Sequence, residues 1–340
     1  MASRGWYIEG AKRLSHRPME LSGPENGEVI VRIEAATICG SDIHYYRHGR
    51  SGPFQIRQPF ILGHEGAGTV VDAGRSELRV GQRVAINPGL QCNRCEMCRR
   101  GRGNLCEKMR YFGSAGVDPP SDGLFCDERV LSVRQLHPVT EDVNFIATSL
   151  SEPTAIALHA IARGGLLSSR SVAIVGAGPV GLLVLILAKA RGAKPIVVIE
   201  PNEYRLGIAR RLGAQGVSRL VTEEGLPVSA FDVVFEASGT VGGLNSALAA
   251  AAKGAVVVQI GNVGNATDGV DLGQILTKEL DIRGAFRFSG EFDEAVDAVS
   301  HGLIPAEILV THRFDFDDLP AAFEATGDPS ALKVALVRRR

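Results

Sequence analysis

The chain has 340 residues, 45% of them hydrophobic, and its 37 Lys and Arg nearly balance its 38 Asp and Glu, giving a formal net charge of −1. This length exceeds what a single hydrophobic core usually spans, so two domains are expected. Nucleic acid and anionic membranes are not expected as partners, because no basic stripe appears beyond Arg338, Arg339 and Arg340 at the C-terminus.

The N-terminal sequence predicts a cytoplasmic protein. MASRGWYIEGAKR lacks the apolar core of a signal peptide, and the longest apolar run, residues 180–188, is too short to cross a membrane. Thiols stay reduced in the cytoplasm, so the six cysteines are interpreted as metal ligands or free thiols before disulfides.

Short alternating runs separated by Gly, Pro, Asn and Asp dominate residues 1–154. This texture is typical of an antiparallel sheet folded into a small β-barrel or sandwich. The predicted strands cover residues 28–35, 68–72, 83–87 and 128–133.

Strand and helix patterns alternate over residues 155–285. Near-continuous apolar strands between helices predict a parallel sheet covered on both faces, which is an α/β domain. The predicted strands are 171–175, 195–200, 231–236 and 255–260, and the predicted helices are 179–190, 202–212 and 241–252. In residues 286–340 this alternation ends, and the pattern predicts helices at 291–300 and 319–326 and a last strand at 332–337. This C-terminal segment is expected to pack on the first domain.

Four cysteines lie close together in a lobe expected at about residues 88–112. Cys92, Cys95, Cys98 and Cys106 are separated by two, two and seven residues. Four thiolates at this spacing can surround one tetrahedral zinc in a closed structural site. An iron–sulfur cluster is the alternative, but a ferredoxin run has three residues before its last cysteine and a proline after it. Cys126 is left over and is interpreted as a small buried residue.

A glycine-rich turn stands between a predicted strand and a predicted helix. Gly176, Gly178 and Gly181 form GAGPVG at the point where backbone amides and the helix N-terminus can receive a pyrophosphate. Glu200 ends the next strand, where a carboxylate accepts hydrogen bonds from ribose hydroxyls and repels a 2′-phosphate. NAD is therefore expected over NADP, although Arg205 weakens this preference because it could pair with a phosphate.

A second metal site is predicted from three residues far apart in the chain. Cys39 lies in ICGSDIHYY, His64 in LGHEGAG and Glu152 in LSEPTAIALHA. A thiolate, an imidazole and a carboxylate suit a catalytic zinc, which keeps a fourth position open for water or substrate. A zinc beside a nicotinamide coenzyme predicts oxidation of an alcohol.

These motifs occur in the order found in the medium-chain zinc-dependent dehydrogenases, and the chain resembles that family over nearly its whole length. CGSDIHYY and SEPTAIALHA are similar to the polyol branch, the sorbitol and xylitol dehydrogenases. MRYFGSA at 109–115, AINP at 85–88 and GAFRFSGEF at 284–292 resemble the L-idonate 5-dehydrogenases within it. One departure is a short segment between Leu212 and Phe231, which puts in doubt a helix at the edge of the sheet.

The resemblance implies a GroES-like β-barrel catalytic domain at 1–154, a Rossmann coenzyme domain at 155–285 and a C-terminal segment at 286–340 that returns to the catalytic domain. It also implies two zincs per chain, NAD as coenzyme and a homotetramer. The implied catalytic residues are Ser41, which would pass the alcohol proton outward, Glu65 beside the metal, and Tyr45, which would also line the substrate pocket. Asp42 is read as a supporting acid, and His44, His48 and His159 receive no metal role.

The remaining implied contacts fall into two groups. Residues expected at the substrate are Tyr111, Phe112, Arg110 and Arg287. Residues expected at the coenzyme are Gly176, Gly178, Pro179, Val180, Gly181, Glu200, Arg205, Ser238, Ile260 and Phe286.

The implied reaction is reversible oxidation of L-idonate to 5-ketogluconate. Oxidation of sorbitol or xylitol is the alternative within the same class. An alternative of another class is a dinucleotide-binding protein without catalysis, and the intact Cys39, His64 and Glu152 argue against it.

Overall fold

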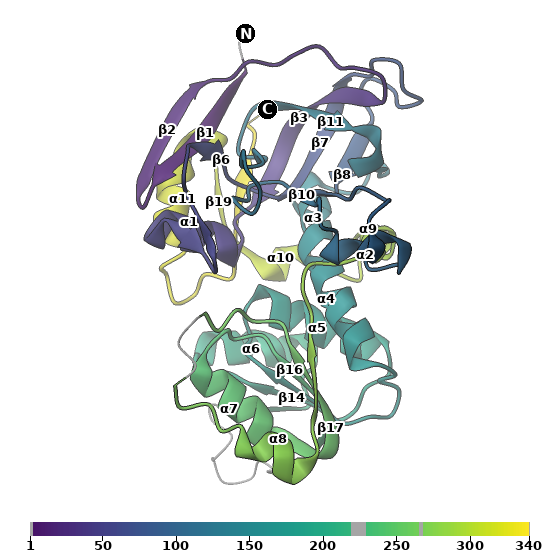
Figure 1. Cartoon of the computed structure of the whole chain (residues 1–340), viewed down its shortest axis with the longest axis vertical. Helices are drawn as coiled ribbons and strands as arrows, with labels where there is room; N and C mark the ends of the chain where they lie inside the picture. Colours follow the sequence, from purple (N-terminus) through teal and green to yellow (C-terminus); the bar gives the residue numbers. More distant parts are fainter. Residues whose placement is uncertain (1–2, 219–228, 265–267, 340) are drawn as a thin grey trace. The chain divides into compact units, whose positions relative to one another are not determined.

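The computed structural model describes residues 3–218, 229–264 and 268–339, which form two compact units. Unit 1 comprises Met1–Glu152 and Phe292–Arg340, and unit 2 comprises Pro153–Glu291. Figure 1 shows the yellow C-terminal segments of unit 1 among its purple N-terminal strands. None of the helices in the described chain is both long and apolar enough to cross a bilayer.

Unit 1 is built mainly from antiparallel sheets. Its largest sheet has the strand order β12 (Leu136–Pro138), β8 (Arg83–Ile86), β7 (Glu65–Asp72), β3 (Glu28–Thr37), β20 (Lys333–Val337) and β19 (Val310–Phe314), with β11 (Glu128–Ser132) also paired to β3. A second sheet has the order β2 (Arg13–Pro18), β1 (Arg4–Gly10) and β6 (Phe60–Ile61). Two short pairs are β9 (Gly89–Leu90) with β10 (Arg110–Tyr111) and β4 (Arg50–Ser51) with β5 (Phe54–Gln55).

Short helices connect the strands of unit 1. They are α1 (Gly40–His48), α2 (Glu96–Arg99), α3 (Phe145–Ser149), α9 (Phe292–Ser300), α10 (Ala306–Leu309) and α11 (Leu319–Ala325), with 3-10 turns η1 (Gly103–Leu105), η2 (Val133–Gln135) and η3 (Phe316–Asp318). The core alternates along β3, where Val29, Val31 and Ile33 are fully buried and the residues between them are half-buried. That period of two places one face of the sheet in the core, as the sequence pattern predicts.

Unit 2 is a parallel sheet with helices. The strand order is β15 (Gly216–Ser218), β14 (Ile196–Ile199), β13 (Val172–Val175), β16 (Phe231–Glu236), β17 (Ala251–Gln259) and β18 (Asp281–Gly284). Figure 1 shows the accompanying helices α4 (Ser151–Gly164), α5 (Pro179–Ala190), α6 (Glu203–Leu212), α7 (Val241–Ala250) and α8 (Gly273–Lys278). Every residue of β13 and β14 is buried, which explains their unbroken apolar sequences.

The predicted α/β class with a preceding antiparallel β region is confirmed. The helix predicted over 241–252 ends at Ala250, because Ala251 begins β17 and pairs with Phe231 of β16. Most of the short segment between Leu212 and Phe231, residues 219–228, lies outside the described residues. Cys126 is buried, as predicted.

Candidate functional site

Three adjacent strands of unit 1 bring a buried ion pair together. Glu65 begins β7 and lies opposite Thr37 of β3, and β20, which begins with Lys333, pairs with the other edge of β3. Lys333 Nζ lies 2.5 Å from Glu65 Oε1, and the Thr37 hydroxyl donates to Glu65 Oε2. Both charged side chains are almost fully buried. Burial alone would lower the pKa of Lys333, but Glu65, Cys39 and Glu152 together outweigh it and raise that pKa.

Cys39 and His64 flank this ion pair, and Asp42 supports both. Cys39 is the residue before α1, and its backbone N–H donates to Asp42 Oδ2 at 2.9 Å. Asp42 Oδ1 accepts from the Gly63 N–H and lies 3.6 Å from Nδ1 of His64. Burial would lower the pKa of His64, but the charges of Asp42 and Cys39 raise it well above its ordinary value. At 3.6 Å this is a contact between charges and is too long for a hydrogen bond.

The side chains of Cys39, His64 and Glu65 can converge on one metal ion, since one potential ligand atom from each lies within 4.8 Å of the others. The buried His64 Nδ1 has no hydrogen-bond partner within the described structure. Glu152, near the start of α4, is buried, and its Oε1 accepts a hydrogen bond of 2.5 Å from the Tyr111 hydroxyl. Burial raises the pKa of Glu152 to about 7, against the opposing effect of His64. Buried acids beside a thiol and an imidazole fit a divalent cation, because a charge costs free energy in the interior unless it is paired or bound to metal.

The other residues predicted at the site in unit 1 differ in how deeply they are buried. Ser41 is half-buried in the first turn of α1. The hydroxyl of Tyr45 accepts from the Ala115 N–H at 3.1 Å, and its ring packs edge-on against Phe60. Phe112 is buried. Arg110 is exposed and precedes Tyr111 in β10, so the alternation of a strand directs the two side chains to opposite faces.

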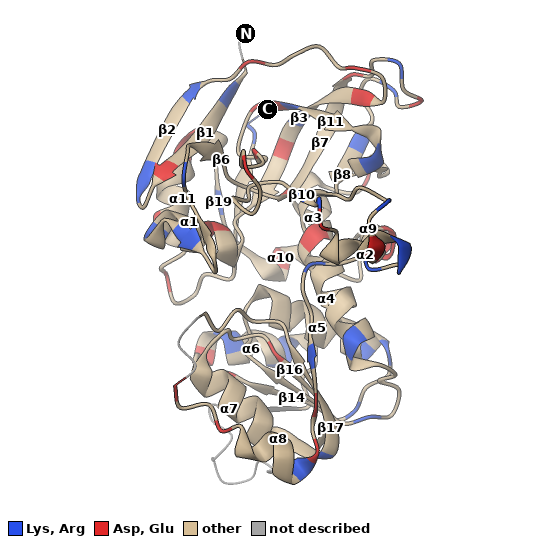
Figure 2. Cartoon of the chain, in the orientation of Figure 1, with Lys and Arg blue, Asp and Glu red and all other residues tan. Residues whose placement is uncertain are grey.

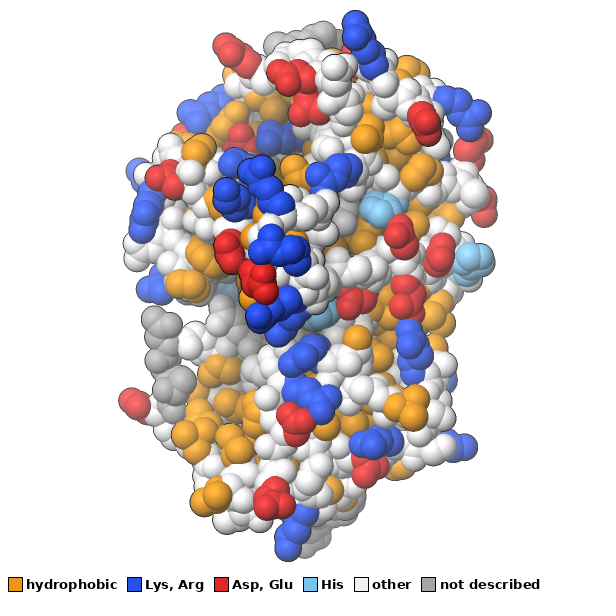
Figure 3. All heavy atoms as spheres, turned by 45° about the vertical axis from the view of Figure 1, so that its right-hand side comes forward, with side chains coloured by type: hydrophobic (Ala, Val, Ile, Leu, Met, Phe, Trp, Pro, Cys, Tyr) orange, Lys and Arg blue, Asp and Glu red, His pale blue; other side chains and the backbone are white. Residues whose placement is uncertain are grey.

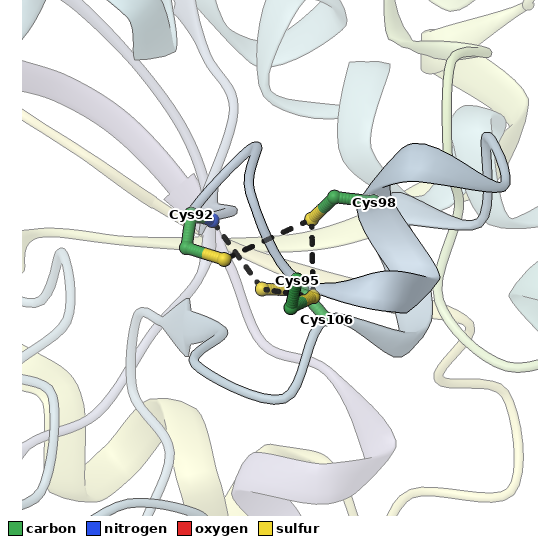
Figure 4. A group of neighbouring side chains, drawn as sticks. All are labelled: Cys92, Cys95, Cys98 and Cys106. Atoms are coloured by element: carbon green, nitrogen blue, oxygen red, sulfur yellow. Dashed lines mark hydrogen bonds between the residues drawn. The ribbon is translucent and has the colours of Figure 1, made fainter.

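The four clustered cysteines form a second metal site. The Sγ atoms of Cys95 and Cys98 are 3.5 Å apart, those of Cys95 and Cys106 are 3.9 Å apart, and those of Cys92 and Cys98 are 4.0 Å apart. Figure 4 shows the four side chains pointing toward one centre. Zinc–sulfur bonds of about 2.3 Å in a tetrahedron place the sulfurs about 3.8 Å apart. The distances therefore fit a tetrahedral zinc.

Basic side chains surround this lobe more densely than the sequence reasoning recognised. Figure 3 shows Lys and Arg side chains gathered on one face of the molecule, and Figure 2 shows charged residues on α2. The exposed cations near the cysteines are Arg94, Arg99, Arg100, Arg102, Lys108 and Arg110. Arg99 and Arg100 both pair with Glu96. A zinc bound by four thiolates would carry a negative charge, and cations close in the sequence would favour it electrostatically.

A cavity of about 540 Å³ opens beside the glycine turn of unit 2. It is lined by Val175, Gly176, Gly178, Ile199, Glu200, Pro201, Arg205, Ala237, Ser238, Thr240, Gly242, Gly243 and Ser246. Gly176 has φ of 97°, and a Cβ there would come within 2.8 Å of the Ser238 nitrogen, so a side chain would not fit. Gly178 is the N-cap of α5, and Pro179 is its first residue. The carboxyl ends of parallel strands at the point where strand order reverses are where dinucleotides bind.

Glu200 supports the glycine turn as well as lining the cavity. Its Oε2 accepts from the Ala177 N–H at 2.8 Å, and its Oε1 accepts from the Asn202 N–H at 3.0 Å. Each carboxylate oxygen has a second lone pair available to a ligand. Glu200 therefore fixes the turn and still offers acceptors to a ribose.

Only some of the remaining residues predicted at the coenzyme line this cavity. Arg205, which is half-buried, and Ser238 line it. The predicted residues that are not among its lining residues are Pro179, Val180, Gly181, Ile260 and Phe286. Phe286 is 49% exposed, and the guanidinium of Arg287 stacks 4.8 Å from its ring.

Sequence reasoning missed Lys333, Thr37 and the fully buried Glu236. The sequence contains a feature that indicates two of these residues, Lys333 and Glu236. Lys333 is a charge inside the apolar run ALKVALV, and Glu236 ends a buried strand as Glu200 does. A charged residue in a strand that is otherwise apolar predicts either a buried partner or a site.

Comparison with known proteins connects these observations. An alcohol dehydrogenase GroES-like domain model matches residues 25–141, and a zinc-binding dehydrogenase model matches residues 179–301. The chain is 34% identical to an L-idonate 5-dehydrogenase (NAD(P)(+)) of Escherichia coli, covering 97% of both chains, and 33% identical to a sorbitol dehydrogenase of Bacillus subtilis, covering 87% of this chain and 86% of that one. It is also similar to the crystal structure of the E. coli L-idonate 5-dehydrogenase, with a TM-score of 0.93, 33% identity, and coverage of 99% and 98%.

Proposed function

The chain belongs to the zinc-containing medium-chain dehydrogenases, in the polyol and sugar dehydrogenase branch, and from that premise we propose that it oxidises L-idonate to 5-ketogluconate with NAD. The fold consists of a GroES-like domain and a Rossmann-type domain. One observation carries the catalytic part of the proposal: Cys39, His64 and two buried acids, Glu65 and Glu152, lie in one chain with a dinucleotide-sized cavity.

The proposed catalytic metal ligands are Cys39, His64 and Glu152. Glu65, and not Glu152, is the acid whose oxygen lies within 4.8 Å of possible ligand atoms of Cys39 and His64. Both oxygens of Glu65 are already engaged, one by Lys333 and the other by Thr37, so we propose Glu152 as the third ligand. A bound zinc would polarise the substrate hydroxyl, and the nicotinamide would accept the hydride that leaves the same carbon. Ser41, half-buried two residues after Cys39, is proposed to carry the hydroxyl proton outward.

The coenzyme preference follows from Glu200. We expect kcat/KM to be higher with NAD than with NADP by about tenfold or more, since a charged hydrogen bond contributes roughly 1.5–3 kcal/mol. Glu200→Ser should lower the ratio of kcat/KM with NAD to kcat/KM with NADP. Because Ser also withdraws the acceptor of the Ala177 N–H, Glu200→Gln is the matched control that keeps an acceptor and removes the charge. Steady-state kinetics with both coenzymes test this, and a wild-type ratio near one, or in favour of NADP, would contradict it.

The choice of L-idonate depends on a group that holds the substrate carboxylate. Arginine suits this task because its planar fork can donate two parallel hydrogen bonds. Arg287 is the first candidate: it lies in GAFRFSGEF, is half-buried, and has φ of 54°, a backbone conformation that non-glycine residues adopt only when their surroundings hold them there. Arg110 is the second candidate.

Replacing Arg287 with Ala should lower kcat/KM for L-idonate on the order of tenfold to a hundredfold, as expected for one lost charged hydrogen bond. The same change should affect sorbitol far less, because sorbitol has no carboxylate. Initial rates on both substrates measure this. Equal losses would show that Arg287 does not recognise the carboxylate.

Sorbitol or xylitol oxidation is the second candidate function. The similarity to a sorbitol dehydrogenase at 33% identity favours it nearly as strongly as the similarity to an L-idonate enzyme at 34% favours the first. A wild-type enzyme that oxidises sorbitol or xylitol but ignores L-idonate would establish it instead.

We also propose a homo-oligomer, with a tetramer as the resemblance implies. Strand β18 ends the sheet of unit 2, and Ile282 on it is 40% exposed. Leu272 and Leu276, beside and on α8, are 64% and 80% exposed. An open strand edge near exposed apolar side chains can pair with a second copy. A monomer mass by light scattering would rule this out.

A further inference from the structure

The buried carboxylate of Glu236 has no role in the metal sites or in the glycine turn. Glu236 is the last residue of β16, has no exposed surface, and lies beside Val175 of β13 in the parallel sheet. Val175 lines the coenzyme cavity and leads into the glycine turn. No Lys or Arg in the described parts of the chain pairs with Glu236, so its buried oxygens depend on hydrogen bonds.

Those hydrogen bonds come from the loop that follows β16. Glu236 Oε1 accepts from the N–H of Ser238 at 2.7 Å, from the N–H of Gly239 at 3.1 Å, and from the Ser238 hydroxyl. The Ser238 hydroxyl is 3.1 Å from that of Thr240, and both residues line the cavity. The loop is therefore folded around the carboxylate, with its outer side forming the cavity wall.

The same residue also holds the loop that follows β17. Glu236 Oε2 accepts from Gln259 Nε2 at 2.5 Å, and Gln259 Nε2 also donates to the carbonyl of Gly261. The backbone carbonyl of Glu236 accepts from the N–H of Ile260 at 2.9 Å and from that of Gly261 at 3.0 Å. A Cβ on Gly261 would lie 2.7 Å from Glu236 Oε2, which shows how closely this loop approaches the carboxylate.

We propose that Glu236 is a positioning residue for the coenzyme: its carboxylate fixes the loop after β16, which lines the cavity, in the shape that receives the dinucleotide, and ties the loop after β17 to it. The proposal rests on the coenzyme site proposed above. Without the carboxylate, the N–H groups of Ser238 and Gly239 lose their acceptor and the loop can rearrange into the cavity or away from it. Binding then has to reorder the loop, which weakens affinity without removing any direct contact.

Titration of NADH fluorescence with the full-length, zinc-loaded protein tests this, with NADPH in parallel. Glu236→Ala should raise the coenzyme Kd on the order of tenfold to a hundredfold, because several charged hydrogen bonds are lost. Glu236→Gln should restore most of the affinity. Its carbonyl oxygen can replace Oε1 as the acceptor for the N–H groups of Ser238 and Gly239. Its amide would face Gln259 Nε2, which is a donor, so the bond to Gln259 is not replaced. A rescue by the uncharged isostere distinguishes loop positioning from attraction by the charge.

Two further variants keep the test decisive. Gln259→Leu, at a residue that does not line the cavity, should raise the Kd by roughly threefold to tenfold, and it serves if Glu236→Ala does not fold. Val234→Ala, in the same strand and equally buried, should lower the urea midpoint and leave the Kd unchanged. An unchanged Kd in a folded Glu236→Ala or in Gln259→Leu would overturn the inference. A wild-type protein that binds neither NADH nor NADPH would instead overturn the proposed coenzyme site.

Discussion

Replacing Lys333 with Met is expected to lower the free energy of unfolding by about 3–5 kcal/mol, because removing one partner of a buried ion pair leaves the other charge uncompensated. Lys333 is 3% exposed and Glu65 is 1% exposed, and their charged atoms are 2.5 Å apart. Lys333 Nζ also donates to the carbonyl of Ile38 at 3.2 Å, next to Cys39. The variant therefore loses both an ion pair and a contact that supports a proposed metal ligand.

The same substitution should also change the metal site. Lys333 neutralises Glu65, so the Cys39 thiolate and the Glu152 carboxylate together match the charge of one divalent cation. Once Lys333 is gone, Glu65 either takes up a proton or binds the metal and closes the open position. Binding of Glu65 to the metal should cost most of the activity, since an open position is what a catalytic zinc offers its substrate. Protonation of Glu65 would leave that position open and should cost less activity.

Urea unfolding of the protein with and without zinc, together with zinc content, measures both effects. The double variant Lys333→Met/Glu65→Gln is the control, because it removes the two charges together and should recover much of the lost stability. Lys333→Arg keeps the charge and should lie between wild type and Lys333→Met. A Lys333→Met protein with wild-type stability and turnover would show that the ion pair contributes neither.

Local patterns in the sequence were sufficient for much of this molecule. The four cysteines lie within one short segment, and the strand, glycine turn and helix of the coenzyme site are contiguous, so spacing alone identifies them. Helix α5 is predicted at the residues where the structure has it, Pro179–Ala190, because its apolar sequence begins at a proline after a glycine turn. Predictions from contiguous sequence succeed because the interactions that decide them are local.

The residues that sequence reasoning missed depend on contacts across the chain. Lys333 and Glu65 are 268 positions apart, and only the pairing of β20 and β7 with the same strand brings them together. Glu236 and Glu200 both end buried strands, yet Glu200 holds the glycine turn while Glu236 holds its own loop. The sequence does not determine which way such a side chain turns.

Helix α1 was also missed, because its polar sequence GSDIHYYRH has no clear apolar stripe, and its N-terminal capping by Asp42 decides where it begins.

Dialysis against a chelator is expected to remove all activity before it affects the fold. Of the proposed catalytic ligands, Cys39 and His64 lie close in sequence to Ile38 and Leu62 of the hydrophobic core of unit 1, and Glu152 lies in the 14-residue helix α4. The open coordination position gives a chelator a place to bind the zinc before any protein ligand leaves. Losing this metal should therefore leave the circular dichroism nearly unchanged.

The four-cysteine site should behave in the opposite way. Cys92, Cys95 and Cys98 are half-exposed, which gives a chelator access, but four thiolates leave no vacant position on the metal. Helix α2 has only four residues and buries none of them, so metal binding supplies most of what folds this lobe. Loss of the second zinc should coincide with loss of ellipticity and with faster proteolysis between residues 92 and 106.

Zinc content, activity and circular dichroism, measured along the same dialysis, show which of the two zincs leaves first and whether the fold is lost with it. Two matched variants assign the metals: Glu152→Ala should bring zinc content close to one per chain and abolish turnover while the fold persists, whereas Cys98→Ser should weaken the lobe and leave Cys39, His64 and Glu152 intact. Both metals leaving together with unfolding would contradict the assignment of one open and one closed site. Loss of the zinc at the four cysteines first, with activity retained, would also contradict the assignment. The solvent exposure of the cysteines, and not the number of ligands on the zinc, would then control the release of the metal.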